Sequence, residues 1–244
     1  MEGKRTKIEL SDVSFIQKGP GKDLVFFHGY LSSKESFTAQ IEYFSAFYRV
    51  TALDFPGFGQ SAPLKEAFSV FDYAEWTKEA LGLLGVVRPH VVAHSFGCRV
   101  AVKMAKGDGQ VFDKILLTGP AGVILKRGTK YRTKVRLYRL VRKIAPRFAE
   151  KHFGSREYRS LSPLMKESYK KIVNEDLRGD AAEIENEVLL VEGERDTTTP
   201  PEEAEAYLSV LQRGKMKRME GGHFAFAEYP VSFNLIAVEF FGHE

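Results

Sequence analysis

The sequence predicts an α/β fold, in which a mostly parallel central sheet carries helices on both faces. Three observations support this prediction. Short apolar runs alternate with amphipathic runs as far as residue 122, and the alternation resumes at residue 186. The apolar run at residues 90–93 passes into a helical pattern with almost no loop between them, and residues 123–185 show helical patterns alone. Strands that alternate with helices are typical of parallel sheets, whose crossovers cover both faces.

The length and composition of the chain predict one domain. The chain has 244 residues, of which 43% are hydrophobic, and this is enough to bury a full core. We predict that residues 1–122 and 186–244 form that core, with residues 123–185 inserted as a helical cap. The single cysteine, Cys98, excludes an internal disulfide framework. Together with an N-terminus that lacks the apolar segment of a signal peptide, this predicts a cytoplasmic location.

The individual elements follow from local patterns. Residues 8–16 predict one or two edge strands, and the Gly-Pro-Gly at 19–21 predicts a turn after them. Apolar side chains recur at helical spacing in 70–84, whereas the strands are short continuous apolar runs. Before the cap we expect strands at 23–27, 50–54, 90–93 and 114–118 and helices at 34–47, 70–84 and 97–105. After the cap we expect strands at 187–192 and 216–219 and helices at 202–212 and 231–241.

The turn between the strand at 90–93 and the following helix places Ser95 at its apex. A strand that turns at once into a helix needs small residues two positions before and after the apex, and Ala93 and Gly97 meet this need. The pattern is the nucleophile elbow G-x-S-x-G with Ala in place of the first Gly. The helix that follows directs its N-terminal amides to the place where an oxyanion would form. The alternative is a serine that caps an ordinary helix.

A serine hydroxyl becomes a good nucleophile only when a base removes its proton and a carboxylate orients that base. In open α/β sheets, functional residues gather at the carboxyl ends of the strands. Four predicted strand ends carry chemically suggestive residues, namely 28–30, Ser95, Asp196 and His223. We therefore expect these residues to meet at one edge of the sheet.

Five short motifs, in their order and spacing, resemble the α/β-hydrolase superfamily, in its serine-nucleophile branch with a helical cap. They are FFHGY (26–30), DFPGFGQS (54–61), AHSFG (93–97), GERDTTTP (193–200) and GGHF (221–224). The resemblance implies Ser95 as the nucleophile, His223 as the general base and acid, and Asp196 as the carboxylate that orients His223. It also implies an oxyanion hole made of the backbone N–H groups of Tyr30 and Phe96.

The function that this resemblance implies is hydrolysis of an ester, thioester or similar acyl bond of a small molecule through an acyl-enzyme. Neither a metal nor a cofactor is expected, since no Cys/His cluster has metal-ligand spacing and no Gly-rich phosphate loop is present. Two alternatives stay open. One is hydrolysis or lyase cleavage of a carbon–carbon bond by the same triad, and the other is a non-catalytic scaffold that binds an acidic partner through a basic cap.

Four further residues are candidates for substrate contact. The alternative role of His28 is to shape the oxyanion loop through hydrogen bonds. The alternative role of Arg195 is to form a structural ion pair. Phe148 and Phe153 lie in the predicted cap, where apolar side chains would roof the pocket. Substrate specificity depends on the shape of such a site more than on the fold.

The predicted cap begins with a strongly basic stretch. From Gly122 to Lys151 there are eleven Lys and Arg residues and one acidic residue, Glu150. Three interpretations remain open: a solvated outer face, a site that attracts an anionic substrate or acidic partner, and contact with an anionic membrane surface. Nucleic-acid binding is not expected, because no reader motif accompanies the charge.

Overall fold

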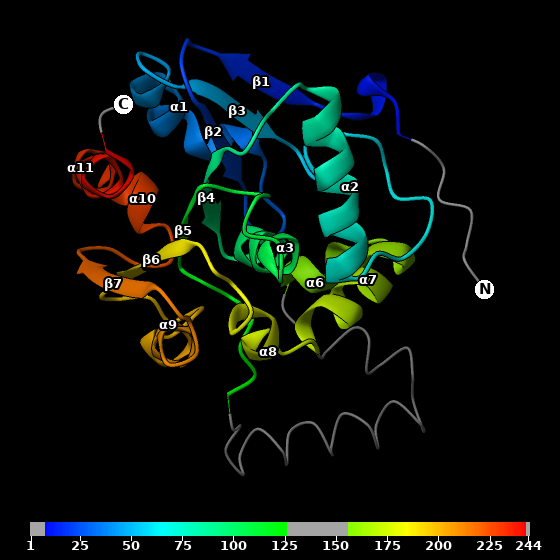
Figure 1. Cartoon of the computed structure of the whole chain (residues 1–244). Helices are drawn as coiled ribbons and strands as arrows, with labels where there is room; N and C mark the ends of the chain where they lie inside the picture. The colour runs from blue at the N-terminus through cyan, green and yellow to red at the C-terminus, as the bar shows by residue number, and fades with distance from the viewer. Residues whose placement is uncertain (1–7, 126–155, 243–244) are drawn as a thin grey trace.

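The fold is described by a computed structural model over residues 8–125 and 156–242. Within these residues the core is a seven-stranded sheet in the order β1-β3-β2-β4-β5-β6-β7 (Figure 1). All neighbouring strands are parallel except β1, which pairs antiparallel with β3. The α/β fold predicted from the alternation of strands and helices is therefore confirmed.

Strands β2 to β7 lie within two residues of their expected positions. The strands are β1 (Phe15–Lys18), β2 (Asp23–Phe27), β3 (Arg49–Leu53), β4 (His90–His94), β5 (Lys114–Thr118), β6 (Glu187–Gly193) and β7 (Gly214–Met219). Residues 8–16, for which one or two strands were expected, contain only the start of β1, preceded by a short 3-10 helix, η1 (Leu10–Asp12).

The helices follow the strands in the order expected for a parallel sheet. They are η2 (Lys34–Phe37), α1 (Thr38–Phe44), α2 (Val70–Leu83), α3 (Phe96–Ala105), α6 (Arg156–Ser160), α7 (Pro163–Val173), α8 (Arg178–Ala181), α9 (Pro201–Leu208), α10 (Ala225–Glu228) and α11 (Pro230–Phe241). The prediction of a single helix over 34–47 is wrong, because the segment begins with the 3-10 helix η2. Asp54 binds both the backbone N–H and the Nζ of Lys34, and these contacts hold that turn against the end of β3.

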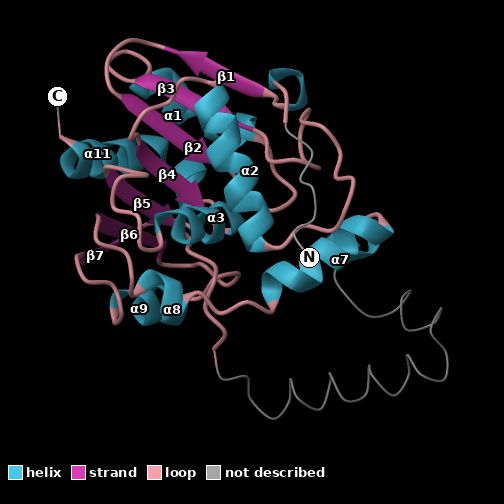
Figure 2. Cartoon of the chain, turned by 45° about the vertical axis from the view of Figure 1, so that its right-hand side comes forward, coloured by secondary structure: helices cyan, strands magenta, loops and turns pink. Residues whose placement is uncertain are grey.

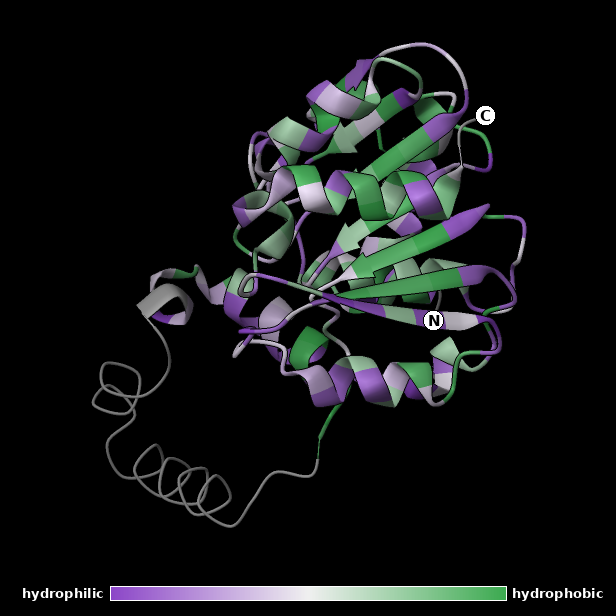
Figure 3. Cartoon of the chain, turned by 90° about the vertical axis from the view of Figure 1, so that its left-hand side faces the viewer, coloured by the Kyte–Doolittle hydropathy of each residue, from purple (hydrophilic) through white to green (hydrophobic). Residues whose placement is uncertain are grey.

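The sheet separates two apolar cores, and alternate residues of each strand enter opposite ones. In β6, Val188 and Leu190 enter the core under α2, α3, α8 and α9, whereas Leu189 and Val191 enter the core under α1, α10 and α11. Figure 2 shows the two groups of helices on opposite sides of the sheet. Figure 3 shows that the central strands are hydrophobic along most of their length. Both faces are covered, so the parallel strands are apolar on both sides.

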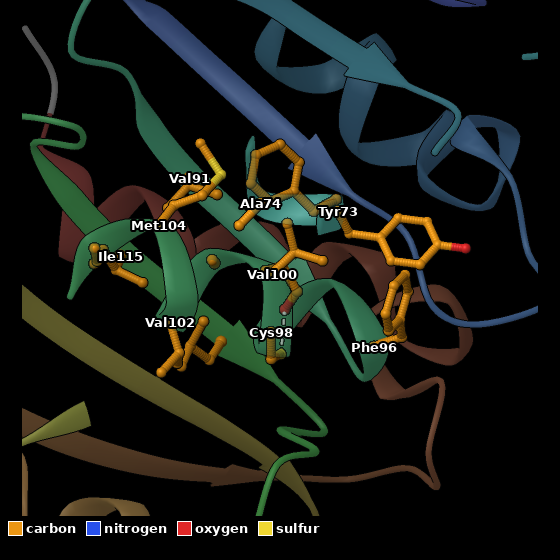
Figure 4. Packing of buried hydrophobic residues seen from close by; sticks show 14 of the residues in the cluster. Tyr73, Ala74, Val91, Phe96, Cys98, Val100, Val102, Met104 and Ile115 are labelled. Atoms are coloured by element: carbon orange, nitrogen blue, oxygen red, sulfur yellow. Dashed lines mark hydrogen bonds between the residues drawn. The ribbon is translucent and has the colours of Figure 1, made fainter. Parts of the chain in front are cut away.

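Helix α3 is the most deeply buried helix around the site, since nine of its ten residues are buried. Phe96 and Val100 pack with Tyr73 and Ala74 of α2, and Ile115 of β5 belongs to the same cluster (Figure 4). A helix buried along nearly its whole length is stable only inside a core. The residue immediately before α3 is therefore held in a rigid frame.

Part of the predicted cap is described, and it touches the core. The side chain of Tyr30 donates a hydrogen bond to the carbonyl of Met165 in α7 at 3.2 Å, and Ser168 Oγ accepts one from the backbone N–H of Phe68 at 2.8 Å. Further along, Leu177 and Ile184 are buried in the same core as β4 and β5. The division into core and cap stays a prediction. The basic stretch from residue 126 onward, with Phe148 and Phe153, lies outside the described residues.

Candidate active site

Ser95 occupies the sharp turn between β4 and α3. Its backbone has φ 50° and ψ −109°, a conformation that non-glycine residues rarely adopt. The turn is held by a hydrogen bond from the backbone N–H of Ser95 to the carbonyl of Thr118 in β5, at 3.1 Å. Burial of α3 on one side and of β4 on the other keeps the strained turn in place. The Ser95 side chain is thereby presented at the carboxyl edge of the sheet.

The structure brings His223 and Asp196 to Ser95 from segments far along the chain. His223 Nε2 lies 3.0 Å from Ser95 Oγ, and His223 Nδ1 lies 2.7 Å from Asp196 Oδ2. Asp196 follows β6 and His223 follows β7, so neighbouring parallel strands deliver both side chains to the same edge. With its Nδ1 proton donated to Asp196, the imidazole can accept a proton from Ser95 at Nε2.

The surroundings of Asp196 favour its ionised form. Asp196 Oδ1 accepts hydrogen bonds from the backbone N–H groups of Thr198 and Thr199, at 2.7 and 3.0 Å. Burial works to raise the pKa of Asp196, but the hydrogen bond from His223 and those from the two threonine amides outweigh it and hold the pKa below its ordinary value. A carboxylate that stays charged can orient His223 and stabilise its protonated form.

Thr199 is a site residue for which the sequence analysis had no role. Its hydroxyl donates to Asp196 Oδ2 at 2.9 Å and lies 3.1 Å from His223 Nδ1. The three consecutive threonines after Asp196 were the available signal, because hydroxyls directly after a carboxylate commonly fold back onto it.

The two segments expected to supply the N–H groups of an oxyanion hole both lie next to Ser95. Phe96 is the first residue of α3, so its N–H has no partner within the helix. The loop that carries Tyr30 passes directly beside Ser95, since a Cβ atom on Gly29 would lie 3.5 Å from Ser95 Cβ and 2.9 Å from Nδ1 of His94. The ring of Tyr30 packs edge-on against Phe96, at 5.6 Å between centroids. Both segments are thus placed where N–H groups could face a reacting carbonyl.

His28 is fully buried, and both of its ring nitrogens face backbone groups. Nδ1 lies 2.7 Å from the carbonyl oxygen of Gly29, and Nε2 accepts a hydrogen bond from the backbone N–H of Phe55 at 3.0 Å. Burial lowers the pKa of His28 to about 4, so the ring is neutral at neutral pH. These contacts agree with a loop-shaping role and leave the ring no exposed surface for a substrate.

Arg195 is exposed and contacts residues that follow β7. Its guanidinium lies 3.7 Å from Glu220 and 3.4 Å from the hydroxyl of Tyr229. These contacts agree with the ion-pair interpretation, and contact with a substrate anion stays a prediction. Phe224, in contrast, is exposed and its ring packs on those of His223 and His94. It adds an apolar surface beside the site that the motif GGHF did not by itself assign to substrate.

Among residues 8–125 and 156–242, no cluster of His, Cys, Asp and Glu has an arrangement that could hold a metal ion. Over the same residues, no helix combines the length and the apolar character needed to cross a membrane.

Comparison with known proteins places the fold and site in context. A sequence model described as the alpha/beta hydrolase fold matches residues 23–181. The chain is 36% identical over 83 residues, or 34% of its length, to (E)-2-((N-methylformamido)methylene)succinate hydrolase of Acinetobacter baylyi. It is 31% identical over 132 residues, or 52% of its length, to the probable lysophospholipase BODYGUARD 3 of Arabidopsis thaliana. The chain covers only 32% and 26% of these two relatives.

The likeness to solved structures extends over nearly the whole chain. A bromoperoxidase from Bacillus anthracis superposes with a TM-score of 0.76 at 19% sequence identity. The match covers 94% of this chain and 95% of the bromoperoxidase. At this level of identity the likeness concerns the fold alone.

Proposed function

The chain belongs to the alpha/beta hydrolase family, and from this premise we propose that it is a serine hydrolase that acts through a Ser95–His223–Asp196 triad. The proposed reaction is cleavage of an ester, thioester or similar acyl bond in a small molecule. One observation carries the proposal: a hydroxyl, an imidazole and a carboxylate from three separate strand ends form a continuous chain of contacts of 3.0 and 2.7 Å. This is the arrangement that activates a serine.

In the acylation step, Ser95 Oγ attacks the substrate carbonyl carbon while His223 Nε2 takes the hydroxyl proton. Asp196 stabilises the positive charge that develops on the imidazole. The backbone N–H groups of Phe96 and Tyr30 would donate hydrogen bonds to the oxyanion of the tetrahedral intermediate. The intermediate collapses when His223 returns the proton to the leaving group, whose bond to the carbonyl carbon breaks and leaves Ser95 acylated.

Deacylation repeats the same proton transfers with water. His223 removes a proton from water, the resulting hydroxide attacks the acyl carbon, and a second oxyanion forms at the same N–H groups. The Ser95–acyl bond then breaks, and the proton held by His223 returns to Ser95 Oγ. The acid product leaves, and the enzyme is restored without a metal or another cofactor.

The described part of the predicted cap contacts a residue of the proposed oxyanion hole. Met165 and Tyr169 of α7 contact the side chain of Tyr30, whose backbone N–H is proposed to bind the oxyanion. Helix α7 therefore lies beside the loop that carries one of the proposed oxyanion donors. A preference for anionic substrates would come from the basic stretch, and the substrate panel described below tests that preference.

Labelling with a fluorophosphonate probe tests the central claim, because such probes react quickly only with a base-activated hydroxyl. We expect peptide mapping to find the label on Ser95, and Ser95→Ala to abolish labelling. Ser209→Ala is the matched control: it removes an exposed hydroxyl that bonds only its own helix end, and labelling should persist. A label on another residue, or none on folded protein, would exclude the proposed mechanism.

A substrate panel then separates the remaining functions. Acyl esters and thioesters of varied chain length, with and without an anionic group, should be turned over by the wild type and not by Ser95→Ala. Turnover restricted to carbon–carbon cleavage of diketone-type substrates would favour the alternative reaction on the same triad. A chain that is labelled by no probe and turns over no substrate, but binds acidic proteins, would instead be a scaffold.

A further inference from the structure

A second carboxyl group lies buried next to the proposed triad. Glu192 is the penultimate residue of β6, and its side chain is on the same face of the sheet as Val188 and Leu190, toward α3 and α9. The residue has no exposed surface, and neither of its carboxyl oxygens has a hydrogen-bond donor. Buried polar groups in native proteins are nearly always paired, so this carboxyl needs an explanation.

The neighbour within hydrogen-bonding reach of Glu192 is Asp196. Three further groups act on Glu192 from the elements around it. Glu203 faces it from α9, the Cys98 thiol from α3 and Arg218 from β7. Arg218, the cation of this set, is half-exposed and already binds Glu205 at 2.8 Å. Glu192 is therefore surrounded mainly by groups that disfavour a negative charge.

Burial, and next the charge of Asp196, raise the pKa of Glu192 to about 8. A carboxyl that keeps its proton has one O–H to donate, whereas an ionised one has none. Asp196 is the acceptor that faces it, and its oxygens already accept from Thr198, Thr199 and His223. A neutral Glu192 would complete this set of donors, and a charged Glu192 would repel Asp196.

We propose that Glu192 is a positioning residue, which stays protonated at neutral pH and donates a hydrogen bond to Asp196. This inference rests on the proposed function of Asp196 as the orienting acid of the triad. Asp196 then carries the single negative charge of the pair and is held in place from both sides, by His223 and by Glu192. When alkali removes the proton of Glu192, the hydrogen bond is lost and the two carboxylates repel each other, so that His223 is less well oriented.

Three variants test this role. Glu192→Gln keeps the shape and an N–H donor at every pH, whereas Glu192→Leu keeps the bulk and removes the donor. Glu194→Gln is the matched control, because it removes a carboxyl from the same turn at an exposed position. The measurement is the rate of fluorophosphonate labelling of Ser95, and of turnover once a substrate is known, across neutral and alkaline pH.

We expect Glu192→Leu to slow the labelling at neutral pH by roughly tenfold, as loss of a hydrogen bond to a charged group would. We expect Glu192→Gln to restore most of that rate and to lack the alkaline decline near pH 8 that the wild type and Glu194→Gln show. An unchanged decline in Glu192→Gln would overturn the proposal. So would equal rates for the Gln and Leu variants.

Two readouts are independent of activity. Infrared spectra at neutral pH should show the carbonyl stretch of a protonated carboxyl in the wild type, and that band should vanish in Glu192→Gln. The folded protein also holds a proton that the unfolded chain releases above its ordinary pKa of 4.5, so the wild type should lose stability relative to Glu192→Gln as pH rises from 4.5 to about 8. If Glu192→Leu fails to fold, the comparison of wild type with Glu192→Gln decides.

The outcomes also separate this inference from the proposed function. If the wild type is not labelled at Ser95, the proposed function fails, whatever the infrared band shows. If the wild type is labelled but the infrared band is absent and the profile of Glu192→Gln matches the wild type, only the role of Glu192 fails.

Discussion

Gly97 and Phe27 approach each other so closely that no side chain fits between them. A Cβ atom built on Gly97 would lie 2.4 Å from the carbonyl oxygen of Phe27, the last residue of β2. That carbonyl belongs to the backbone of a central strand and cannot move aside without breaking the sheet. The first turn of α3 is therefore pressed against the end of β2, next to the loop that carries Tyr30. This contact keeps the first turn of α3, with Phe96, next to the loop that carries Tyr30.

Gly97→Ala should accordingly destabilise the protein by about 1–3 kcal/mol or more, because the added methyl group overpacks a rigid contact. Chemical denaturation monitored by circular dichroism measures this change. Gly82→Ala in α2 is the control, since a Cβ atom there meets nothing within 4 Å. That substitution should stabilise the protein by roughly 0.5–1 kcal/mol. Equal effects of the two substitutions would contradict the contact described above.

Ser95→Ala and His223→Ala should each remove most of the activity, and the double variant should be little worse than either. Residues that act as one unit are not additive, and losses in comparable triads are on the order of 10⁶-fold. The measurement is kcat on the best substrate of the panel, with thermal unfolding to verify that each variant folds. Additive losses in the double variant would show that the two residues act separately.

The pair Lys34–Asp54 should contribute to stability far more than a surface ion pair. Lys34 is only 5% exposed and its Nζ lies 2.8 Å from Asp54, which is fully buried. Burial works to lower the pKa of Lys34, but hydrogen bonds to Asp54 and Glu35 outweigh it and raise the pKa. Lys34→Met leaves the Asp54 charge buried without its partner, which should cost about 3–5 kcal/mol.

The control for this pair is Lys78→Met, because Lys78 binds Asp108 at the surface, with both side chains exposed. Its loss should change the free energy of unfolding by about 0–1 kcal/mol. Denaturation of both variants under one set of conditions compares them directly. A small effect of Lys34→Met would mean that water replaces the lost contact to Asp54.

Acid should destabilise the protein between pH 6.5 and about 4, through two buried histidines. Burial lowers the pKa of His28 to about 4, and burial with the nearby His223 lowers that of His94 to about 3, against an ordinary value of 6.5. In this pH range the unfolded chain therefore binds protons that the folded protein does not bind. Stability is fully present above pH 6.5 and falls on acidification, by up to about 1.4 kcal/mol per pH unit for each histidine.

His94→Asn should reduce this acid slope by about one proton, whatever it does to stability at neutral pH. Asparagine does not titrate, although its shorter side chain loses the contact that His94 Nε2 makes with the carbonyl oxygen of His223 at 2.9 Å. The measurement is the free energy of unfolding at several pH values for both proteins. An unchanged slope would show that His94 does not titrate in this window.

The sequence by itself determined the parts of this protein that depend on neighbouring residues. The elbow around Ser95 was predictable because a strand, a sharp turn and a helix follow each other within a few positions. Asp196 and His223 were predictable as partners because parallel strands deliver their carboxyl ends to one edge, and the motifs marked which ends mattered. The alternation of apolar and amphipathic runs determined the fold class for the same reason.

Only the tertiary structure decided which charged and polar side chains are buried, and what they meet. Glu192 and Lys34 are ordinary charged residues in the sequence, yet one lies beside Asp196 without a donor and the other is paired with Asp54. The segment expected as one helix over 34–47 begins as the 3-10 helix η2, whose first residue contacts Asp54, twenty positions away. Burial and pairing arise from contacts between distant segments, and local patterns carry no information about which segments the fold brings together.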